Sequence, residues 1–540
     1  MKLKLLIVFS IFPTIFIQAQ VSRVDQLNSS FTQGGLDQTN QILAMNNNVY
    51  LNARTQSNGK ELFTSNGIGV SLVKDLNGSP TNFSGNPNIM FYRSFTNEIF
   101  FRADDAPTPS NFELWKTDGS SGGTVKVHEF NTNGSSNPRR FTEFNNEVFF
   151  AVTGYNTGEE LGFSDGTSAG SGIIEIMPGV TGSEPQRFKK FNGELYFSAA
   201  TSYGRELWKT DGTQVGTVLV KDINSGANDS NPEELIVFDN RLYFVAEDTT
   251  NGRELWTTDG TTSGTQIVSD LNSGTVDSNP NNLTVFKGRL FFSAITAATG
   301  REIFTALPTN GGITLFRDIV TGTTGCNAEK FFHYTAQNIL LFVAGNGNTN
   351  KELWYTNGSL VFTNQVKDIN VGSSSSSINS INSNFAEYNG KVYFGADDGS
   401  NGNEVWVTDG TTVGTEIISD IYSGTNDSNP SFLTVANNTL FFRARKSDGY
   451  ELYKYIDPAL SINEFELNNI KLYPNPASNN ITIDSKTKID SVEIFDALGK
   501  SVLVFNESLS TYSINSLNSG LYFVKINGEG KEITKKLIKN

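Results

Sequence analysis

Short runs of apolar and aromatic residues alternate with polar, glycine-rich segments along most of this chain. The segment from Asn231 to Leu271 is representative, and it predicts four strands: Glu234–Phe238, Arg241–Ala246, Arg253–Thr258 and Gln266–Leu271. Runs of this length that are rich in aromatic and β-branched residues and bounded by turn formers are typical of strands. Because the intervening segments are short, we expect the four strands to form an antiparallel meander.

The third of these runs contains a motif of Glu, an apolar residue and an aromatic residue that returns along the chain. Each copy begins 46 to 52 residues after the previous one. The copies begin at Glu61, Glu113, Glu160, Glu206, Glu254, Glu302, Glu352, Glu404 and Glu451, and the copy at Glu160 is degenerate. A period of about 40 to 50 residues indicates a propeller or another repeat array.

Both faces of each predicted sheet must be covered, because the strands carry bulky side chains on successive residues, as in Leu242-Tyr243-Phe244. Radial stacking of four-stranded sheets around an axis covers both faces and leaves only short edges. The sequence therefore predicts an all-β chain with a β-propeller of four-stranded antiparallel blades. A β-solenoid is the alternative, although its coils are usually shorter than this period and parallel.

The number of blades depends on the two ends of the repeat region. Eight complete units run from Gln41 to Ile421, and Ser431 to Tyr455 supplies three more strands. The segment from Val21 to Asn28 resembles a fourth strand of the repeat, so we expect it to complete the last blade. This gives nine blades, and eight with a frayed end is the alternative, since 4 to 8 is the usual range.

The two ends of the chain differ from the repeats. Residues 1–19 have a basic start and a short apolar run, which predicts a signal peptide. Residues 20–456 form the predicted repeat domain, 457–463 a linker, and 464–540 a further domain. This last part contains six or seven short strands and predicts a small Ig-like β-sandwich.

Composition narrows the possible partners. The formal net charge is −15, and no basic run interrupts the acidic repeats, so a nucleic-acid backbone would be repelled. Apart from the signal peptide, no stretch is long and apolar enough to span a bilayer. The single cysteine, Cys326, has no partner for an internal disulfide, and we expect a buried, inert thiol.

Four blocks near the C-terminus resemble the type IX secretion C-terminal sorting domain of Bacteroidota. They contain Tyr473, Pro474, Asn475 and Pro476, then Gly499, then Gly520 and Tyr522, and finally Lys535 and Lys536. The resemblance covers the last 75 or so residues, and the blocks follow the order of the family. It implies that the type IX machinery exports the protein, which then is anchored at the outer-membrane surface or released.

The repeats resemble the family of secreted bacterial propellers named for its Glu-Leu-Trp…Asp-Gly-Thr motif. The segment Asp259-Gly260-Thr261, with Gly264 and Thr265, is also similar to the Asp-box turns of sialidase propellers. Its spacing departs from theirs, because Asp and Gly are adjacent here. This second similarity predicts a turn between the third and fourth strands, and it implies no sialidase activity.

Residues that occur once per repeat are first expected to be structural. The repeated Glu is predicted to bond between blades or to nearby backbone, and the Trp two residues later to pack between blades, in preference to stacking on a sugar. The two histidines, His128 and His333, lie in different repeats without metal-ligand spacing or a marked nucleophile. No phosphate loop or dinucleotide fingerprint is present.

A meander places the second-to-third strand loops and the connections between blades on one face. That face is predicted to carry an acidic rim of candidate binding residues: Asp104, Asp105, Asp222, Asp229, Asp248, Asp270, Asp277, Asp397, Asp398, Asp420 and Asp427. Carboxylate and amide oxygens in loops are typical ligands of calcium, so calcium is a possible cofactor. Asp, Asn and Ser are also ordinary turn formers, and turn capping is the simpler interpretation.

Three functions follow from these observations. The first is a secreted or surface-displayed module that binds a glycan, a matrix polymer or a protein through the loop face, with no catalytic residue assigned. The second is a glycan-active hydrolase or lyase that uses a pair of loop carboxylates. The third is a passive surface spacer. A carboxylate pair that is unique to one or two blades and converges in a cleft lined by exposed aromatics would favour the enzyme, and an even ring of loops would favour binding. A spacer would show neither a cleft nor an exposed aromatic cluster.

Overall fold

The computed structural model describes residues 21–27, 35–36, 41–55, 58–76, 85–104, 110–308, 312–346, 350–372, 374–378, 384–458, 471–485, 489–497, 499–507, 509, 511–528 and 531–540. The predicted signal peptide, Asp105 and most of the predicted linker lie outside the described residues. The chain divides into two compact units, Met1–Ile456 and Asp457–Asn540. Among the described residues, no helix has the length and apolar character needed to cross a membrane.

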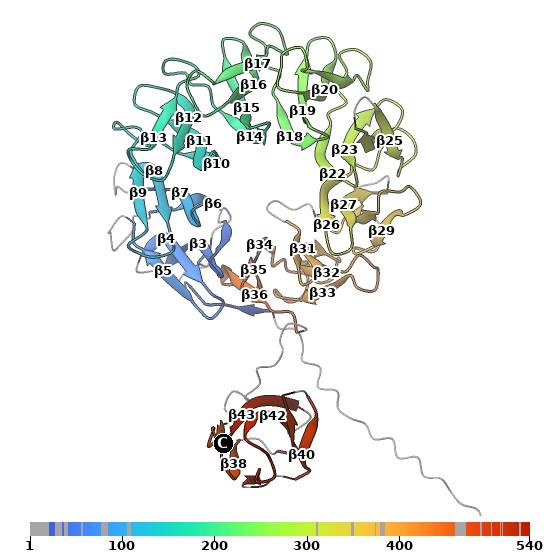
Figure 1. Cartoon of the computed structure of the whole chain (residues 1–540). Helices are drawn as coiled ribbons and strands as arrows, with labels where there is room; N and C mark the ends of the chain where they lie inside the picture. The colour runs from blue at the N-terminus through green and yellow to red at the C-terminus, as the bar shows by residue number, and fades with distance from the viewer. Residues whose placement is uncertain are drawn as a thin grey trace, which may run out of the picture. The chain divides into compact units, whose positions relative to one another are not determined.

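The first unit consists of antiparallel sheets that follow one another around a common centre (Figure 1). Its described residues form nine four-stranded sheets, which we number in chain order. Sheets 1 to 8 each contain four consecutive strands, and sheet 9 contains β34, β35, β36 and the N-terminal strand β1. The predicted all-β class and the predicted four-stranded meander are therefore confirmed.

Every sheet has the same strand order. The first strands are β2 (Ile42–Met45), β6 (Asn88–Arg93), β10 (Arg139–Phe144), β14 (Gln186–Phe191), β18 (Glu233–Phe238), β22 (Asn281–Phe286), β26 (Glu329–Tyr334), β30 (Ala386–Tyr388) and β34 (Ser431–Ala436). The second strands are β3 (Asn48–Thr55), β7 (Glu98–Asp104), β11 (Glu147–Thr153), β15 (Glu194–Thr201), β19 (Arg241–Asp248), β23 (Arg289–Thr296), β27 (Ile339–Gly345), β31 (Lys391–Asp397) and β35 (Thr439–Lys446).

The third strands carry the repeated Glu. They are β4 (Gly59–Ser65), β8 (Phe112–Thr117), β12 (Glu159–Ser164), β16 (Gly204–Thr210), β20 (Gly252–Thr258), β24 (Gly300–Ala306), β28 (Lys351–Thr356), β32 (Asn403–Thr408) and β36 (Gly449–Tyr455). The fourth strands are β5 (Val70–Lys74), β9 (Val125–His128), β13 (Ser171–Ile174), β17 (Val218–Lys221), β21 (Gln266–Ser269), β25 (Ile313–Arg317), β29 (Thr363–Lys367), β33 (Glu416–Ser419) and β1 (Ser22–Arg23).

Hydrophobic side chains fill the space between neighbouring sheets. One cluster joins Tyr196 and Leu207 of sheet 4 to Leu242, Phe244 and Trp256 of sheet 5, and all five side chains are buried. Both faces of each strand are covered in this way, which explains why consecutive residues are apolar. Burying one such side chain contributes about 2 to 3 kcal/mol to stability.

The last sheet packs against the first. Ser22 of β1 pairs with Lys454 of β36, as predicted from the N-terminal sequence. A further cluster joins Val49 and Leu51 of sheet 1 to Phe441 of sheet 9. The two ends of the repeat region therefore lie next to each other, and sheet 9 packs against sheet 1 through hydrophobic side chains.

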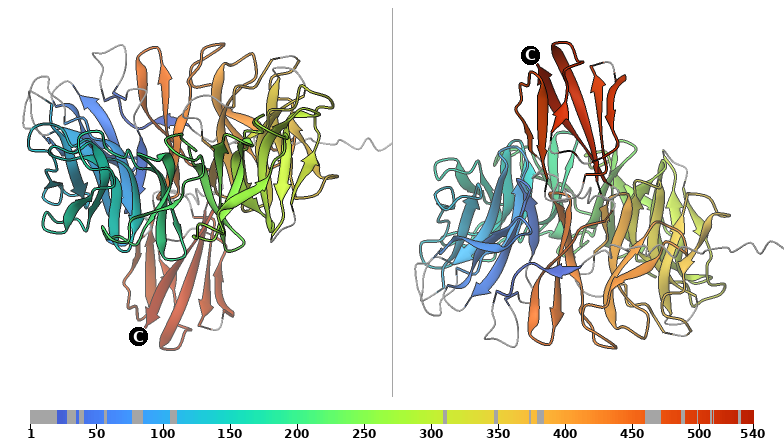
Figure 2. Two further views of the ribbon diagram at one scale, coloured as in Figure 1. Left: turned by 90° about the horizontal axis from the view of Figure 1, so that it is seen from above. Right: turned by 90° about the horizontal axis from the view of Figure 1, so that it is seen from below.

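The turns and loops of the first unit gather on two opposite faces, as the views in Figure 2 show. We call one the turn face, because it carries the turns between first and second strands and between third and fourth strands. Asp239 and Asn240 make one of these turns, with φ values of 48° and 56°, as their residue types predict. We call the other the loop face, because it carries the second-to-third strand loops and the connections between sheets.

The second unit contains two sheets in its described residues. One has the order β37-β38-β41 and the other β40-β39-β42-β43. The strands are β37 (Lys471–Tyr473), β38 (Asn480–Asp484), β39 (Ser491–Asp496), β40 (Ser501–Phe505), β41 (Tyr512–Ser513), β42 (Gly520–Gly528) and β43 (Lys531–Lys539). Buried residues from both sheets, including Ile481, Val492 and Val524, share one core.

Candidate binding site

The repeated Glu holds the connection between its own sheet and the next. In sheet 4, Glu206 accepts hydrogen bonds from the backbone N–H groups of Ile223 at 3.0 Å and Asn224 at 3.3 Å, and from the Ser230 hydroxyl at 2.6 Å. The carboxylates that make equivalent bonds to the following connection belong to Glu61, Glu113, Glu160, Glu254, Glu302, Glu352 and Glu404.

Glu451 extends this arrangement to the last sheet. It accepts hydrogen bonds from the N–H groups of Leu27 and Gly35, which lie between β1 and sheet 1. The predicted structural role of the repeated Glu is therefore confirmed. We call each of these carboxylates with its donors a glutamate clamp.

Burial perturbs the ionisation of the clamps. It raises the pKa of Glu206 to about 7, because a carboxylate loses its hydration there, while the bonds from Ser230, Ile223 and Asn224 act in the opposite direction. Burial raises the pKa to about 7 also in Glu61, Glu113, Glu254, Glu352 and Glu404. The clamps are therefore poised to titrate near neutral pH.

The hydroxyl partner of the clamp was not predicted from the sequence. A Ser follows the Glu by 23 or 24 residues in several repeats, as with Glu206 and Ser230, or Glu254 and Ser278. In the clamp of Glu302 this place is taken by Cys326, whose backbone N–H donates to Glu302 at 2.8 Å. The predicted burial of Cys326 is confirmed, and burial raises the pKa of its thiol.

The aromatic and histidine side chains singled out in the sequence are structural. Trp115, Trp256 and Trp406 are buried in clusters between sheets, as predicted. The Nδ1 atom of His128 lies 2.9 Å from the Ser168 hydroxyl on the next sheet. Lysines at the equivalent place in other fourth strands make similar bonds to the next sheet, so His128 is one more tie between neighbours.

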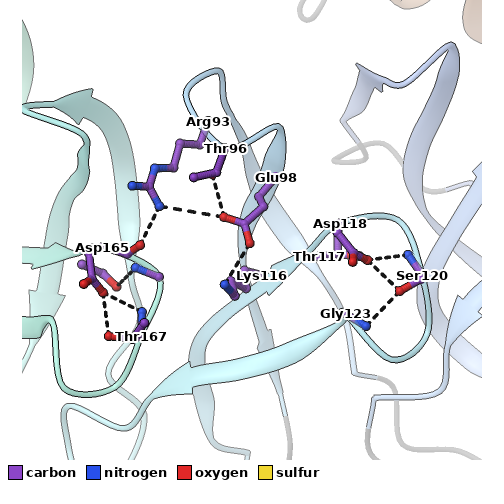
Figure 3. A network of polar contacts seen from close by, with 12 residues as sticks. Arg93, Thr96, Glu98, Lys116, Thr117, Asp118, Ser120, Gly123, Asp165 and Thr167 are labelled. Carbon is purple, nitrogen blue, oxygen red and sulfur yellow. Dashed lines mark hydrogen bonds and ion pairs between the residues drawn. The ribbon is translucent and has the colours of Figure 1, made fainter.

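The third-to-fourth strand turns of sheets 2 to 5 and 8 are built on an Asp, in line with the Asp-box similarity, and those of sheets 1 and 7 on an Asn. Asp118 accepts hydrogen bonds from the N–H and hydroxyl groups of Ser120, and the Ser120 hydroxyl accepts one from Gly123 (Figure 3). These bonds lower the pKa of Asp118. Arg93 of sheet 2 donates at 2.7 Å to the carbonyl oxygen of Asp165, which opens the same turn in sheet 3. The turns thus also join neighbouring sheets.

The predicted acidic rim consists of capped turns in the structure. Asp229, Asp277 and Asp427 each accept a hydrogen bond from the backbone N–H of the residue that directly precedes a repeated Glu. The carboxylates that accept bonds from backbone N–H groups of their own loops are Asp104, Asp222, Asp248, Asp270, Asp397, Asp398 and Asp420. No group of three or more His, Cys, Asp or Glu side chains that could hold a metal occurs among the described residues.

At the inner edge of the loop face, a side chain of one sheet accepts a hydrogen bond from the first strand of the next. The Oδ1 atom of Asn282 in sheet 6 accepts from the N–H of Lys330 in sheet 7 at 3.0 Å. Within the described part of the chain, a similar bond to the N–H one residue further along is made at three further junctions, by Gln41 with Met90, Glu234 with Leu283, and Asn384 with Leu433. We call this bond the inner tie. Sheets 2, 7 and 9 carry Ile89, Lys330 and Phe432 at the position of Asn282, with the same left-handed backbone.

Sheets 3 and 4 carry an arginine at the position of the inner tie. Arg140 and Arg187 share with Asn282 a left-handed backbone, with φ values of 61°, 62° and 60°. A guanidinium has donors and no acceptor, so neither arginine can make the inner tie. Arg140 instead donates to the carbonyl oxygen of Pro185 at 3.1 Å.

Two cavities lie at the junctions that follow these arginines. The cavity between sheets 4 and 5 encloses about 240 Å³ and is lined by Arg187, Arg205, Arg253, Asn231, Glu233 and Glu247, among others. The cavity between sheets 3 and 4 encloses about 300 Å³ and is lined by Arg140, Phe141, Thr142, Gln186, Arg187 and Phe188. Gln186 and Arg187 belong to both walls, so the two cavities adjoin. We call them together the arginine cavities.

The arginines of the cavities are held by ion pairs. Glu233 binds two of them, Arg187 at 3.1 Å and Arg253, and Glu184 binds Arg205 at 2.9 Å. These side chains come from the strand ends at the loop face, which is the face that the sequence predicts to bind. The arginines themselves were not predicted, and none of the predicted aspartates is in either cavity wall.

A signal for these residues is present in the sequence. The residue before the repeated Glu pairs with the start of the first strand of its sheet, as in Arg253 with Glu233 and Lys351 with Glu329. In sheet 3 the two charges are exchanged, so that Glu159 pairs with Arg139. A comparison of the repeats position by position reveals this exchange.

The predicted sorting residues lie in the second unit. Asn475 holds the last strand, because its side chain donates to the carbonyl oxygen of Lys536 at 2.7 Å and accepts from the N–H of Ile538 at 2.9 Å. The hydroxyl of Tyr522 donates to the carbonyl oxygen of Asn518 at 3.0 Å. Gly499 is in the β39–β40 turn with a φ of 81°. Lys535 and Lys536 are on β43, and Gly520 begins β42.

Solved structures with a similar arrangement are distant. PorZ, a surface component of the type IX secretion system of Porphyromonas gingivalis, is 14% identical with a TM-score of 0.27, over 91% of this chain and 80% of that chain. The extracellular domain of BT4673 from B. thetaiotaomicron is 12% identical with a TM-score of 0.36, over 94% and 70%. Oligopeptidase B from Leishmania major is 14% identical with a TM-score of 0.31, and the match spans 58% of this chain and 47% of that one.

The comparison with protein families identifies the C-terminal part of the chain. Among curated proteins no match was found. Residues 471–540 match the family described as the secretion system C-terminal sorting domain. This confirms the prediction of a type IX sorting domain at this end. The protein is therefore one that this secretion system exports, and it is secreted or attached to the cell surface.

Proposed function

We propose that the first unit is a binding module that takes an extracellular ligand in the arginine cavities. The observation that carries this proposal is the pair of adjoining arginine-lined cavities at sheets 3 to 5. A glutamate clamp is present in every sheet, so it serves the fold. The inner tie is replaced by Arg140 and Arg187 at two neighbouring junctions, and the arginine cavities are at those two junctions.

The geometry supports binding in preference to catalysis. In the wall of the cavity between sheets 4 and 5, Glu233 is shared by two guanidinium groups, and Glu247 accepts a hydrogen bond from Asn231 at 2.9 Å. Carboxylates engaged in this way position the arginines. Side chains on the rigid ends of strands are also better placed to hold a ligand in one orientation than side chains on long loops.

The wider architecture in this proposal is a closed β-propeller of nine blades, in which the N-terminal strand completes the last blade. We assign it to the Glu-Leu-Trp…Asp-Gly-Thr propellers on the resemblance of its repeats. Residues 1–19 serve as the signal peptide, 20–456 as the propeller, 457–463 as the linker and 464–540 as the sorting domain. The ligand is a glycan, a matrix polymer or a protein outside the cell.

A glycan array tests the proposal with the purified mature chain, in the presence and absence of a calcium chelator. We expect a defined set of glycans to bind the wild-type chain and to be lost from the double variant Arg205→Gln, Arg253→Gln. An equal signal from both chains would place the binding outside the arginine cavities. The chelator arm tests the calcium proposed for the aspartate loops, whose removal lowers binding only if the ion supports the site.

A further inference from the structure

The arginine cavities carry positive charge in an acidic protein. We infer that their ligand is a polysaccharide with carboxylate groups, that is, a uronate polymer, and this inference rests on the binding function proposed above. The chain has a formal net charge of −15, so an excess of cations at one site is unexpected unless the ligand is an anion. The walls of the two cavities nevertheless contain four arginines and two glutamates.

Further charges flank the cavity walls. Arg139 pairs with Glu159, which also pairs with Arg140 at 3.0 Å, and Arg205 pairs with Glu184. Glu234 lies near Arg187, so the excess of guanidinium groups is confined to the walls of the cavities themselves. An anionic group that enters the cavities therefore meets a local surplus of donors, although the rest of the protein repels it at long range.

The arginines are already arranged for a carboxylate. Both carboxylate oxygens of Glu233 are used, one by Arg187 and the other by Arg253. A guanidinium has five N–H donors in a planar fork that fits a carboxylate. In the described part of the chain, the contacts of Arg187 use its Nη2 atom, and its side chain is 55% exposed. Donors remain on Arg187 for a ligand.

The second cavity supplies a less polar wall beside the charges. Phe141 and Phe188 are half-buried members of that wall, where they pack on Phe150 and Phe197, and Thr142 and Gln186 line it as well. A sugar ring has an apolar face and hydroxyl groups at its edge, so an aromatic surface next to hydroxyl and amide groups suits it. A uronate residue combines that ring with a carboxylate. The adjoining cavities match the two parts of such a residue and favour a polymer over a lone anion.

Calorimetry with the full-length mature chain tests this inference. The probes are oligogalacturonate, its methyl ester, which has the same backbone without the charges, and dextran sulfate with dextran as its neutral counterpart. We expect oligogalacturonate to bind and its methyl ester to bind about tenfold or more weakly, because hydrogen bonds to a charged group are lost.

Two variants provide the structural control. Arg187→Gln keeps a side chain that can make the inner tie, as Gln41 does, so we expect binding to fall about tenfold or more with an unchanged or higher Tm. Lys351→Gln removes the cation that pairs with Glu329 in sheet 7, the place that Arg253 has in sheet 5. We expect this variant to bind oligogalacturonate like the wild type.

The outcomes separate the ligand class from the binding function. Equal binding of oligogalacturonate and its ester, or binding of dextran sulfate alone, overturns the uronate assignment. If Arg187→Gln abolishes that binding, the cavities are still the binding site. Binding that is indifferent to Arg187→Gln overturns both. If no probe binds while the glycan array shows arginine-dependent binding of a neutral glycan, the uronate assignment fails and the proposed function stands.

Discussion

Two junctions of the first unit differ at one residue of their inner edge. Between sheets 6 and 7, Asn282 accepts a hydrogen bond from the N–H of Lys330, and the first strands are tied together. Between sheets 4 and 5, the same position is Arg187, which has no acceptor, and a cavity of about 240 Å³ lies there. The repeat scaffold thus tolerates different residue types at this position of the inner edge.

Each of these two junctions has a glutamate clamp of its own. Glu206 holds the connection from sheet 4 to sheet 5, and Glu302 holds the connection from sheet 6 to sheet 7. The residues of the inner edge therefore differ between these junctions, while each junction keeps a glutamate clamp. The predictions below test this division, first at the shared clamp and then at the features that differ.

The largest effect is expected from the loss of a clamp. Glu206→Ala and Glu302→Ala each leave two or more buried N–H groups without an acceptor, and each such group costs about 1 to 3 kcal/mol. We expect each variant to lower the free energy of unfolding by about 3 kcal/mol or more, measured by denaturant titration. The two values should be similar, because the clamp is common to both junctions.

The control for this prediction is Glu206→Gln. It keeps the shape of the side chain and one oxygen acceptor, so we expect a smaller loss of stability than in Glu206→Ala. If Glu206→Ala were as stable as the wild type, the clamp would not hold the connection. If it were destabilising only at one of the two junctions, the division between a common scaffold and a variable edge would be wrong.

The pH dependence of stability is the next effect in size. Burial raises the pKa of Glu206 to about 7, above its ordinary value of 4.5, and the neighbouring carboxylate of Asp222 acts in the same direction. A group with a raised pKa in the folded state contributes stability that is complete below its ordinary pKa and is lost as the pH rises through 7. Because the other clamps share this shift, we expect the Tm to fall between pH 5 and pH 8.

Differential scanning calorimetry of the wild type and Glu206→Gln isolates the contribution of one clamp. We expect the variant to show a smaller fall in Tm between pH 5 and pH 8 than the wild type, since the amide does not titrate. An equal or steeper fall in the variant would show that other groups set the pH dependence and that Glu206 is charged in the folded protein throughout this range.

The sequence predicts the sheets and the structural role of the repeated Glu, because both repeat with the same spacing. Its partner Ser230 could also have been found, since the interval from Glu to Ser recurs. The arginine cavities could not be predicted in the same way. Arg140 and Arg187 follow a Pro by two residues, as Asn282 does, but which position of the first strand reaches the next sheet depends on a bulge with a left-handed residue.

The predicted aspartates show how position and residue type are weighed together. Their place in loops of one face predicts a binding rim, and their residue type predicts turn capping, which is the simpler interpretation. In the structure Asp229 and Asp248 cap backbone N–H groups close to the cavity between sheets 4 and 5, and they shape the loops that border it. Residues that repeat at the same place in many sheets serve the turns, and the site is marked by the residues that depart from the repeat.

A smaller effect is expected when the tied junction is made to resemble the open one. Asn282→Arg removes the acceptor of the inner tie and places Arg at a left-handed position that Asn adopts more readily. We expect the free energy of unfolding to fall by about 1 kcal/mol, measured by denaturant titration. The matched change Arg187→Asn should not lower stability. If both changes destabilised equally, the inner tie would make no contribution of its own.

The smallest effect is expected at the one place where the clamps of the two junctions differ. Cys326 stands in the clamp of Glu302 where Ser230 stands in the clamp of Glu206. Cys326→Ser supplies a hydroxyl that can donate to the carboxylate, as Ser230 does at 2.6 Å, and it gives up a slightly larger and more apolar side chain. Because a hydroxyl is a stronger donor than the thiol that now contacts Glu302, we expect the variant to be more stable by about 0.5 kcal/mol, as measured by denaturant titration with the thiol kept reduced. A loss of 1 kcal/mol or more would mean that the pocket around Cys326 selects for an apolar sulfur and that the clamp of Glu302 differs in kind from that of Glu206.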